Sequence, residues 1–183
     1  MADIDLDTKL KLYMLILNRY RDVISKSEEL SITEIRQRIT PYSDFVKNLR
    51  DKLISDISSY DYEKDFFNAM QKCVDYIREI KNFEFLLTFW MSFEEMDKLK
   101  AADIMDQALL LTALLRSLGS ETVKVHVTKT KRIYVGFDYK GEKMLINPAS
   151  GSILRDDDVA NVFQNDPLSY SFNDLSYETF EGE

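Results

Sequence analysis

Cysteine and histidine, which carry much of the catalytic and metal-binding chemistry of proteins, are nearly absent from this sequence. Its 183 residues include one cysteine, Cys73, and one histidine, His126. A lone cysteine excludes an intramolecular disulfide, which suits a reducing compartment. One thiol and one imidazole also cannot supply the Cys and His cluster of a zinc site. We therefore predict a cytoplasmic protein that has no metal ion and no other cofactor.

Long apolar stretches and an excess of positive charge are missing as well. No stretch approaches the roughly 20 apolar residues that cross a bilayer. The apolar segment near the N-terminus is preceded by acids and followed closely by Asn18, Arg19 and Arg21, unlike a secretory signal. With 24 basic and 32 acidic residues, the net charge is −8, whereas nucleic-acid affinity depends on a positive surface. We expect neither a membrane nor a nucleic acid as a partner.

Glycine and proline are scarce too, with five and three residues, so the few present mark the ends of elements. Through the first two-thirds of the chain, apolar residues recur at helical spacing, as in the stripe Leu10, Met14, Leu17, Tyr20 and Ile24. The most apolar helix is predicted over 101–118, and Gly119 suits the left-handed residue that often follows a helix. The dense apolar run at 83–91 fits a buried strand or a buried helix segment.

After Gly119 the apolar period changes from 3.6 to 2, which predicts strands. Short links between them indicate an antiparallel meander over 123–128, 133–139 and 142–146. The sequence thus predicts an α+β fold. Its helical N-terminal region, residues 1–82, packs on a core of one buried helix and a small antiparallel sheet, residues 83–165. Residues 166–183 show no clear period and are predicted to form a C-terminal tail.

The buried helix carries a resemblance to a known family. The segment DIMDQALLLTALLRSLG, from Asp103 to Gly119, resembles the nucleophile helix of the transglutaminase-like superfamily, which has the papain-like cysteine-protease fold. That family shows a Cys, one further residue, an Asp, an Ala and leucines that end in Leu-Leu-Arg-x-Leu-Gly. The segment RIYVGFDYKGEKMLINPASG is similar to the next two strands of that family. There the family has a His at the start of the first strand and an Asp-Pro at the end of the second. The similarity covers roughly residues 70 to 150.

The resemblance implies a catalytic triad whose reactive groups are missing here. The nucleophile position falls on Ile104, the histidine position on Arg132 and the orienting position on Asn147. Isoleucine has no heteroatom that attacks an acyl carbon, and arginine stays protonated and is no base. A shift of the alignment by one residue supplies no Cys–His pair. The resemblance therefore predicts a pseudoenzyme, a domain that is not an enzyme.

The remaining reactive residues have ordinary structural interpretations. Cys73 lies on the apolar stripe of a predicted helix, where a lone cysteine is usually a small buried hydrophobe. His126 lies on the polar side of the first strand and is predicted to be solvated. Asp103 and Asp106, three residues apart, are expected in a first helical turn, where acids complement the helix dipole.

Three functional hypotheses remain. The first is a non-catalytic scaffold module that binds a protein or peptide in the former catalytic cleft, with Arg132 available to pair with Asp106 or with a ligand carboxylate. The residues expected to line this cleft are Asp103, Asp106, Arg132, Tyr134 and Asn147. The alternative is a hydrolase-type or metal-assisted enzyme that uses Asp103, Asp106, Arg132 and Tyr134. The third is a structural subunit whose helical half is an oligomer interface; the sequence does not fix the oligomeric state.

Overall fold

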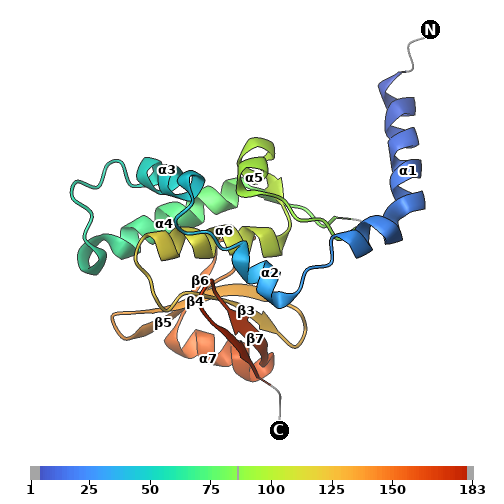
Figure 1. The fold of residues 1–183 in the computed structure, drawn as a ribbon. Coiled ribbons are helices and arrows are strands. Elements are labelled where there is room, and N and C mark those ends of the chain that lie inside the picture. Colours follow the sequence, from blue (N-terminus) through green and yellow to red (C-terminus); the bar gives the residue numbers. More distant parts are fainter. Residues whose placement is uncertain (1–4, 86, 181–183) are drawn as a thin grey trace.

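The computed structural model describes residues 5–85 and 87–180. In this part of the chain the helices lie mainly in the first two-thirds and the strands in the last third (Figure 1). The mixed architecture confirms the predicted α+β class. The helices are α1 (Leu6–Ser27), α2 (Ile32–Gln37), α3 (Asp44–Leu53), α4 (Tyr62–Glu79), α5 (Phe93–Leu99), α6 (Ile104–Ser117) and α7 (Asp156–Asn165).

The strands form one large sheet and one small ladder. The ladder is parallel and joins β1 (Lys81–Asn82) to β2 (Ala101–Ala102). The large sheet is antiparallel, in the order β6-β5-β4-β3-β7-β8. Its strands are β3 (Lys124–Thr128), β4 (Ile133–Tyr139), β5 (Glu142–Ile146), β6 (Ile153–Arg155), β7 (Leu168–Phe172) and β8 (Tyr177–Thr179). The predicted meander is therefore confirmed as β3, β4 and β5, inside a larger sheet.

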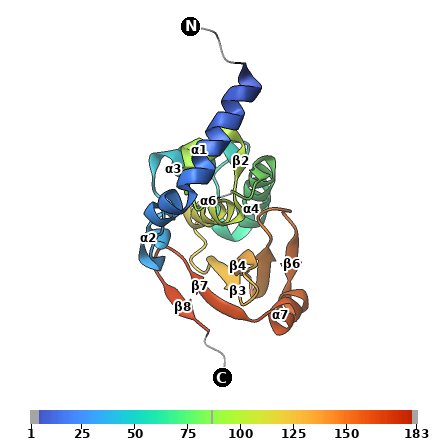
Figure 2. The same ribbon diagram turned by 90° about the vertical axis from the view of Figure 1, so that its right-hand side faces the viewer.

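The helix α6 is the centre of the core. Every residue from Asp106 to Arg116 is buried, which agrees with a sequence that is apolar on nearly all sides. Figure 2 shows α6 and α4 on one side of the sheet and α7 on the other. Burial of a leucine stabilises a fold by roughly 1.5–3 kcal/mol, so this helix contributes a large share of the apolar driving force.

The two faces of the sheet belong to separate apolar clusters. On β4, Ile133, Val135 and Phe137 face the main core with α4 and α6. The alternate residue Tyr134 packs with Leu145 and with Val159 of α7 in a second, smaller cluster. This division follows from the period of a strand, in which successive side chains point to opposite faces.

Several helix ends form from signals that lie close together in the sequence. Ser31 with Glu34 and Ser92 with Glu95 both make complete capping boxes, at the starts of α2 and α5. Asp103 is the N-cap of α6, and Gly119 follows that helix with a φ of 101°. These signals are local and depend on residues three apart or fewer, which explains why the sequence predicts them well.

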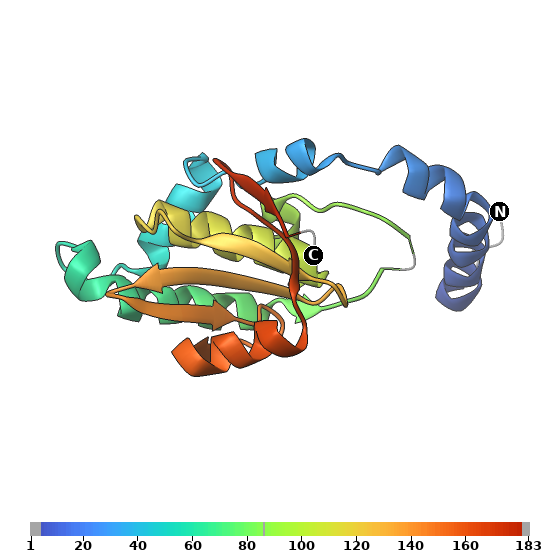
Figure 3. The same ribbon diagram turned by 90° about the horizontal axis from the view of Figure 1, so that it is seen from below.

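The helix α1 corrects the expectation that the whole N-terminal region packs on the core. It has no buried residue and projects away from the rest of the molecule (Figures 1 and 3). Apolar periodicity indicates that a helix has a face to cover, but it does not say what covers it. Among the described residues, no helix combines the length and the apolar content that crossing a bilayer requires.

Two other segments differ from the prediction. The described part of the run 83–91 is neither strand nor helix but an irregular loop. Its aromatic rings meet edge to face, Phe83 with Phe85 and Phe85 with Phe89. The predicted C-terminal tail contains β7 and β8, and β7 pairs with β3. The alternation of β7, with Leu168, Tyr170 and Phe172 between serines, is a strand signal that the sequence analysis overlooked.

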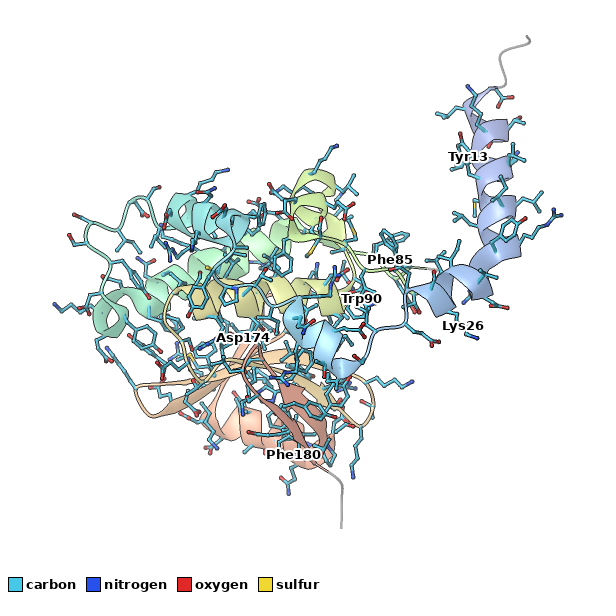
Figure 4. The ribbon with its side chains drawn as sticks, in the orientation of Figure 1. Tyr13, Lys26, Phe85, Trp90, Asp174 and Phe180 are labelled. Carbon is cyan, nitrogen blue, oxygen red and sulfur yellow. The ribbon has the colours of Figure 1, made fainter. Side chains whose placement is uncertain are left out.

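A buried ion pair joins α6 to the turn between β7 and β8. The Nε and Nη2 atoms of Arg116 donate to the two carboxylate oxygens of Asp174, at 2.8 and 3.2 Å. The side chains of Arg116 and Asp174 are only 6% and 15% exposed. Arg36 of α2 donates to the carbonyl oxygens of Asn173 and Asp174 in the same turn. Figure 4 shows Asp174 between α6 and the strands.

We expect Asp174→Ala to lower the free energy of unfolding by about 3–5 kcal/mol, because it leaves the Arg116 charge buried without a counter-charge. The matched control is Asp56→Ala, which removes the exposed partner of Lys72 and is expected to cost less than about 1 kcal/mol. Urea unfolding of both variants measures the difference. Equal losses of unfolding free energy in the two variants would contradict the larger contribution of the buried pair.

Candidate functional site

A hollow of about 530 Å³ opens at the N-terminal end of α6. Its walls come from four parts of the chain: the last turns of α1, the loop from Asn82 to Trp90, the first residues of α6 and the first residue of β4. The described side chains around it include Ile104, Met105 and Ile133 at the base and an aromatic wall of Phe83, Phe85, Phe89 and Trp90. This hollow, called here the α6 cleft, is the place where the resemblance puts a catalytic cleft.

The aromatic wall is held at both ends by polar contacts. At its far end, the Nε1 of Trp90 donates to the carbonyl oxygen of Glu28 at 2.9 Å, and the amide of Thr88 donates to the Oγ of Ser25 at 3.2 Å. At its near end, the amide of Phe83 donates to the carbonyl oxygen of Ala102 at 2.8 Å. The loop thus bridges the end of α1 and the start of α6. Figure 4 shows Phe85 and Trp90 between the body and α1.

Much of this apolar wall is open to solvent. Phe83 is 54% exposed and Phe89 is 39% exposed. The guanidinium of Arg38 lies over the ring of Trp90, at 5.4 Å from its centroid. Exposed aromatic side chains gathered in a hollow are typical of surfaces that bind other molecules.

The start of α6 holds two carboxylates in different environments. Asp103 caps the helix and accepts a hydrogen bond from the amide of Asp106 at 2.7 Å. Asp106 is buried, and its Oδ2 accepts from the amide of Met91 at 3.3 Å while its Oδ1 has no partner. Burial, with a smaller contribution from the charge of Asp103, raises the pKa of Asp106 to about 7. Burial also raises the pKa of Asp103.

The three positions implied by the resemblance do not share one hollow. Ile104 lines the α6 cleft. The side chain of Arg132 is 68% exposed, lies 3.9 Å from the carboxylate of Asp166 and lines a different hollow, beside α7. The Oδ1 of Asn147 accepts from the amides of Ala149 and Ser150, in the turn that follows β5. Asn147 therefore stabilises its own turn.

Strand alternation explains where Arg132 lies. The next residue, Ile133, faces the α6 cleft, so Arg132 and Tyr134 point to the opposite face, that of α7. The counter-charge of Arg132 is accordingly Asp166, in place of the predicted Asp106. Of the five residues expected in one cleft, Asp103 lies at its edge, and Asp106 is buried below it.

The single thiol and the single imidazole lie on opposite sides of the sheet. Cys73 is buried in the main core, as predicted, and burial raises its pKa to about 12. His126 is not solvated as expected: it lies under α7 against Phe163, and its Nδ1 is buried without a partner. Burial lowers the pKa of His126 to about 4. The sequence missed this because it did not place α7 over the polar side of β3.

The α6 cleft combines aromatic rings with a few polar groups. Its described lining has neither a thiol nor an imidazole, and the Oγ of Ser25 accepts a hydrogen bond from the amide of Thr88. Within residues 5–85 and 87–180, His, Cys, Asp and Glu form no group of three or more that suits a metal ion. What the cleft offers is aromatic stacking, apolar contact and charges at its rim, from Arg21, Glu84 and Asp103.

Sequence reasoning placed Ile104 in the cleft but missed most of its walls. The contributions of Arg21 and Ser25, which lie far along the chain from α6, depend on tertiary contacts that no local pattern reveals. The sequence did contain a sign of the irregular aromatic loop, because its dense apolar run lacks both the length of a helix and the alternation of a strand.

We expect the contribution of Asp106 to the free energy of unfolding to fall as the pH rises from about 4 to about 7. The folded state keeps a proton on Asp106 up to about pH 7, whereas the unfolded state releases it near pH 4. Asp106→Asn keeps an acceptor for the amide of Met91 and has no carboxyl group to lose a proton. The variant is therefore expected to be more stable than the wild type by about 2–4 kcal/mol at neutral pH. Urea unfolding across this pH range checks it, and a difference that does not change with pH would contradict it.

We expect Gly136→Ala to destabilise the protein by about 1–3 kcal/mol through overpacking. A Cβ at Gly136 would lie 2.6 Å from two atoms of the His126 ring. His126→Ala in the same chain removes this clash and is expected to recover most of the loss. A double-mutant cycle of unfolding free energies measures the coupling, and simple additivity of the two changes would rule out the described contact.

Comparison of the chain with models of protein families, with curated proteins and with solved structures gave no match.

Proposed function

We propose that this protein is a non-catalytic domain that binds a segment of another protein or a peptide in the α6 cleft. The observation that carries the proposal is the aromatic wall, a set of exposed rings around a hollow of about 530 Å³ with Ile104 at its base. Ligand sites are typically concave and mostly apolar, with a few polar groups that fix orientation. The α6 cleft has this composition.

The lining suggests the chemistry of the ligand. A segment with one or two large apolar or aromatic side chains would stack against Phe83, Phe85 and Phe89 and contact Ile104. Buried aromatic anchors in a central hollow supply most of the free energy in many interfaces. The rim carries both signs of charge, Arg21 against Glu84 and Asp103, so it would orient a polar backbone or a zwitterionic segment rather than select a strongly charged one.

The resemblance to the transglutaminase-like superfamily adds no support to the proposal, because Ile104, Arg132 and Asn147 do not share one hollow. The enzymatic alternative has weaker support, because its four residues do not meet. Asp103 lies at the α6 cleft, Tyr134 lies on the α7 face, and Arg132 lines another hollow.

We expect peptides selected from a random-peptide phage library on the purified protein to shift the emission of Trp90. Trp90 is the one tryptophan of the chain and lines the cleft, so its fluorescence reports occupancy directly. Ile104→Glu is expected to weaken binding of a selected peptide at least about tenfold, because it places a charge against apolar ligand surface.

The matched control is Leu175→Glu, which introduces the same charge at an exposed position in the turn between β7 and β8 and should leave the affinity unchanged. Equal weakening by both variants, or peptides that bind without a change in Trp90 emission, would place the site elsewhere. Amidase, peptidase and transamidase assays form a second arm. Turnover that is lost on Asp106→Asn or on Cys73→Ser would overturn the non-catalytic proposal.

A further inference from the structure

The helix α1 presents an unusual amount of apolar surface to solvent. It is 22 residues long and has no buried residue, and its contacts with the body lie near its C-terminal end, at Ser25 and Glu28. Figure 3 shows the rest of the helix standing clear of the body, and Figure 4 shows Tyr13 on this free part. A single helix without tertiary packing is marginal in water, so its apolar side chains call for a partner.

The spacing of those side chains identifies the kind of partner. Apolar residues recur at alternating steps of four and three along the whole helix, the spacing of a coiled-coil seam, at Leu6, Leu10, Tyr13, Leu17, Tyr20 and Ile24. A helix that packs on a globular body commonly shows a wider stripe with a period of 3.6. Leu12, Met14, Leu15, Ile16 and Val23 are exposed apolar residues outside this seam, but only the repeat of 3.5 runs the whole length of the helix. The repeat therefore points to another helix of similar length.

Self-pairing satisfies this seam when the two helices run antiparallel. In that arrangement Leu6 faces Ile24 of a second copy, Leu10 faces Tyr20, and Tyr13 faces Leu17, so each large ring lies opposite an aliphatic side chain. The two-fold axis crosses the seam between Tyr13 and Leu17, at the middle of the seam. The same surface is used by both copies, as a two-fold interface requires.

Charge also selects the antiparallel direction. Asp7 and Arg21 lie on the same flank of the seam, two heptads apart. Antiparallel pairing brings Asp7 of each copy beside Arg21 of the other, which gives two ion pairs of opposite charge. Parallel pairing would instead place Arg21 beside Ile16. Asp7 is exposed and bonded to Lys11 on its own helix, which leaves carboxylate lone pairs for a second donor.

We propose that α1 is a dimerisation helix that forms an antiparallel two-stranded coiled coil with α1 of a second copy of this chain. The seam runs the length of the helix, about 33 Å at 1.5 Å per residue. None of its six apolar residues lines the α6 cleft, whereas the flanking Arg21 does, so the apolar seam stands independently of the proposed function.

Two substitutions at neighbouring positions test the seam. Leu17 lies in the seam, whereas Leu15 lies on the opposite side of the helix, and both are exposed leucines, by 45% and 56%. Sedimentation of the full chain at several concentrations is expected to give twice the 21.4 kDa monomer mass. Leu17→Lys is expected to yield monomer, and Leu15→Lys to stay dimeric, while the unfolding midpoint of the body is the same in both.

Three results would overturn the seam. The first is a strictly monomeric wild type. The second is equal dissociation by Leu15→Lys and Leu17→Lys, which would indicate unspecific apolar contact. The third is a monomer that sediments with vesicles of neutral and anionic phospholipids and loses this binding equally in both variants, which would make α1 a lipid-binding helix.

The charge pattern tests the direction. Asp7→Arg and Arg21→Asp each replace two opposite-charge pairs by two like-charge pairs and are expected to weaken dimerisation about tenfold. Both substitutions in one chain exchange the charges and are expected to restore the wild-type dissociation constant. Failure of the double variant to recover affinity would exclude the antiparallel arrangement.

Discussion

The complete burial of α6 is the constraint from which the rest of the fold follows. A helix with no exposed side from Asp106 to Arg116 must be covered all round, and α3, α4 and the β4 face of the sheet do this. Its two charged residues lie at the ends of the buried stretch, where polar partners are within reach. Arg116 meets the carboxylate of Asp174, and Asp106 meets the amide of Met91. In the first contact both carboxylate oxygens accept from Arg116, whereas the second leaves the Oδ1 of Asp106 without a partner.

The α6 cleft lies at the N-terminal end of α6, near Asp106. The loop that forms its aromatic wall is tied to α6 through Met91 and to α1 through Trp90, with no regular secondary structure of its own between Phe83 and Met91 in the described residues. Edge-to-face ring contacts in place of ladder hydrogen bonds make a wall whose side chains can adapt to a ligand. Binding surfaces on loops held by a rigid scaffold are common for this reason.

Local chemistry explains which parts of the fold the sequence predicts. The strands of the β3–β5 meander and the glycine that follows α6 depend on neighbours in sequence, and both form as expected. The capping boxes at Ser31 and Ser92 and the N-cap at Asp103 are equally local. The position of Arg132 depends on which face of β4 meets α6, a choice that one residue of register reverses. The environment of His126 depends on α7 crossing the sheet. The open surface of α1 depends on its tertiary contacts, which apolar periodicity along the helix does not determine.

The place where α1 joins the body has a consequence for valency. The α6 cleft lies beside the C-terminal end of α1, through Arg21 and Ser25. In an antiparallel pair the two C-terminal ends lie at opposite ends of a rod of about 33 Å. The two clefts of such an assembly would lie at opposite ends of the paired helices, at a fixed separation. Targets that carry two suitable segments at that distance would be held with avidity well beyond the affinity of one cleft, and targets with a single segment would be released readily.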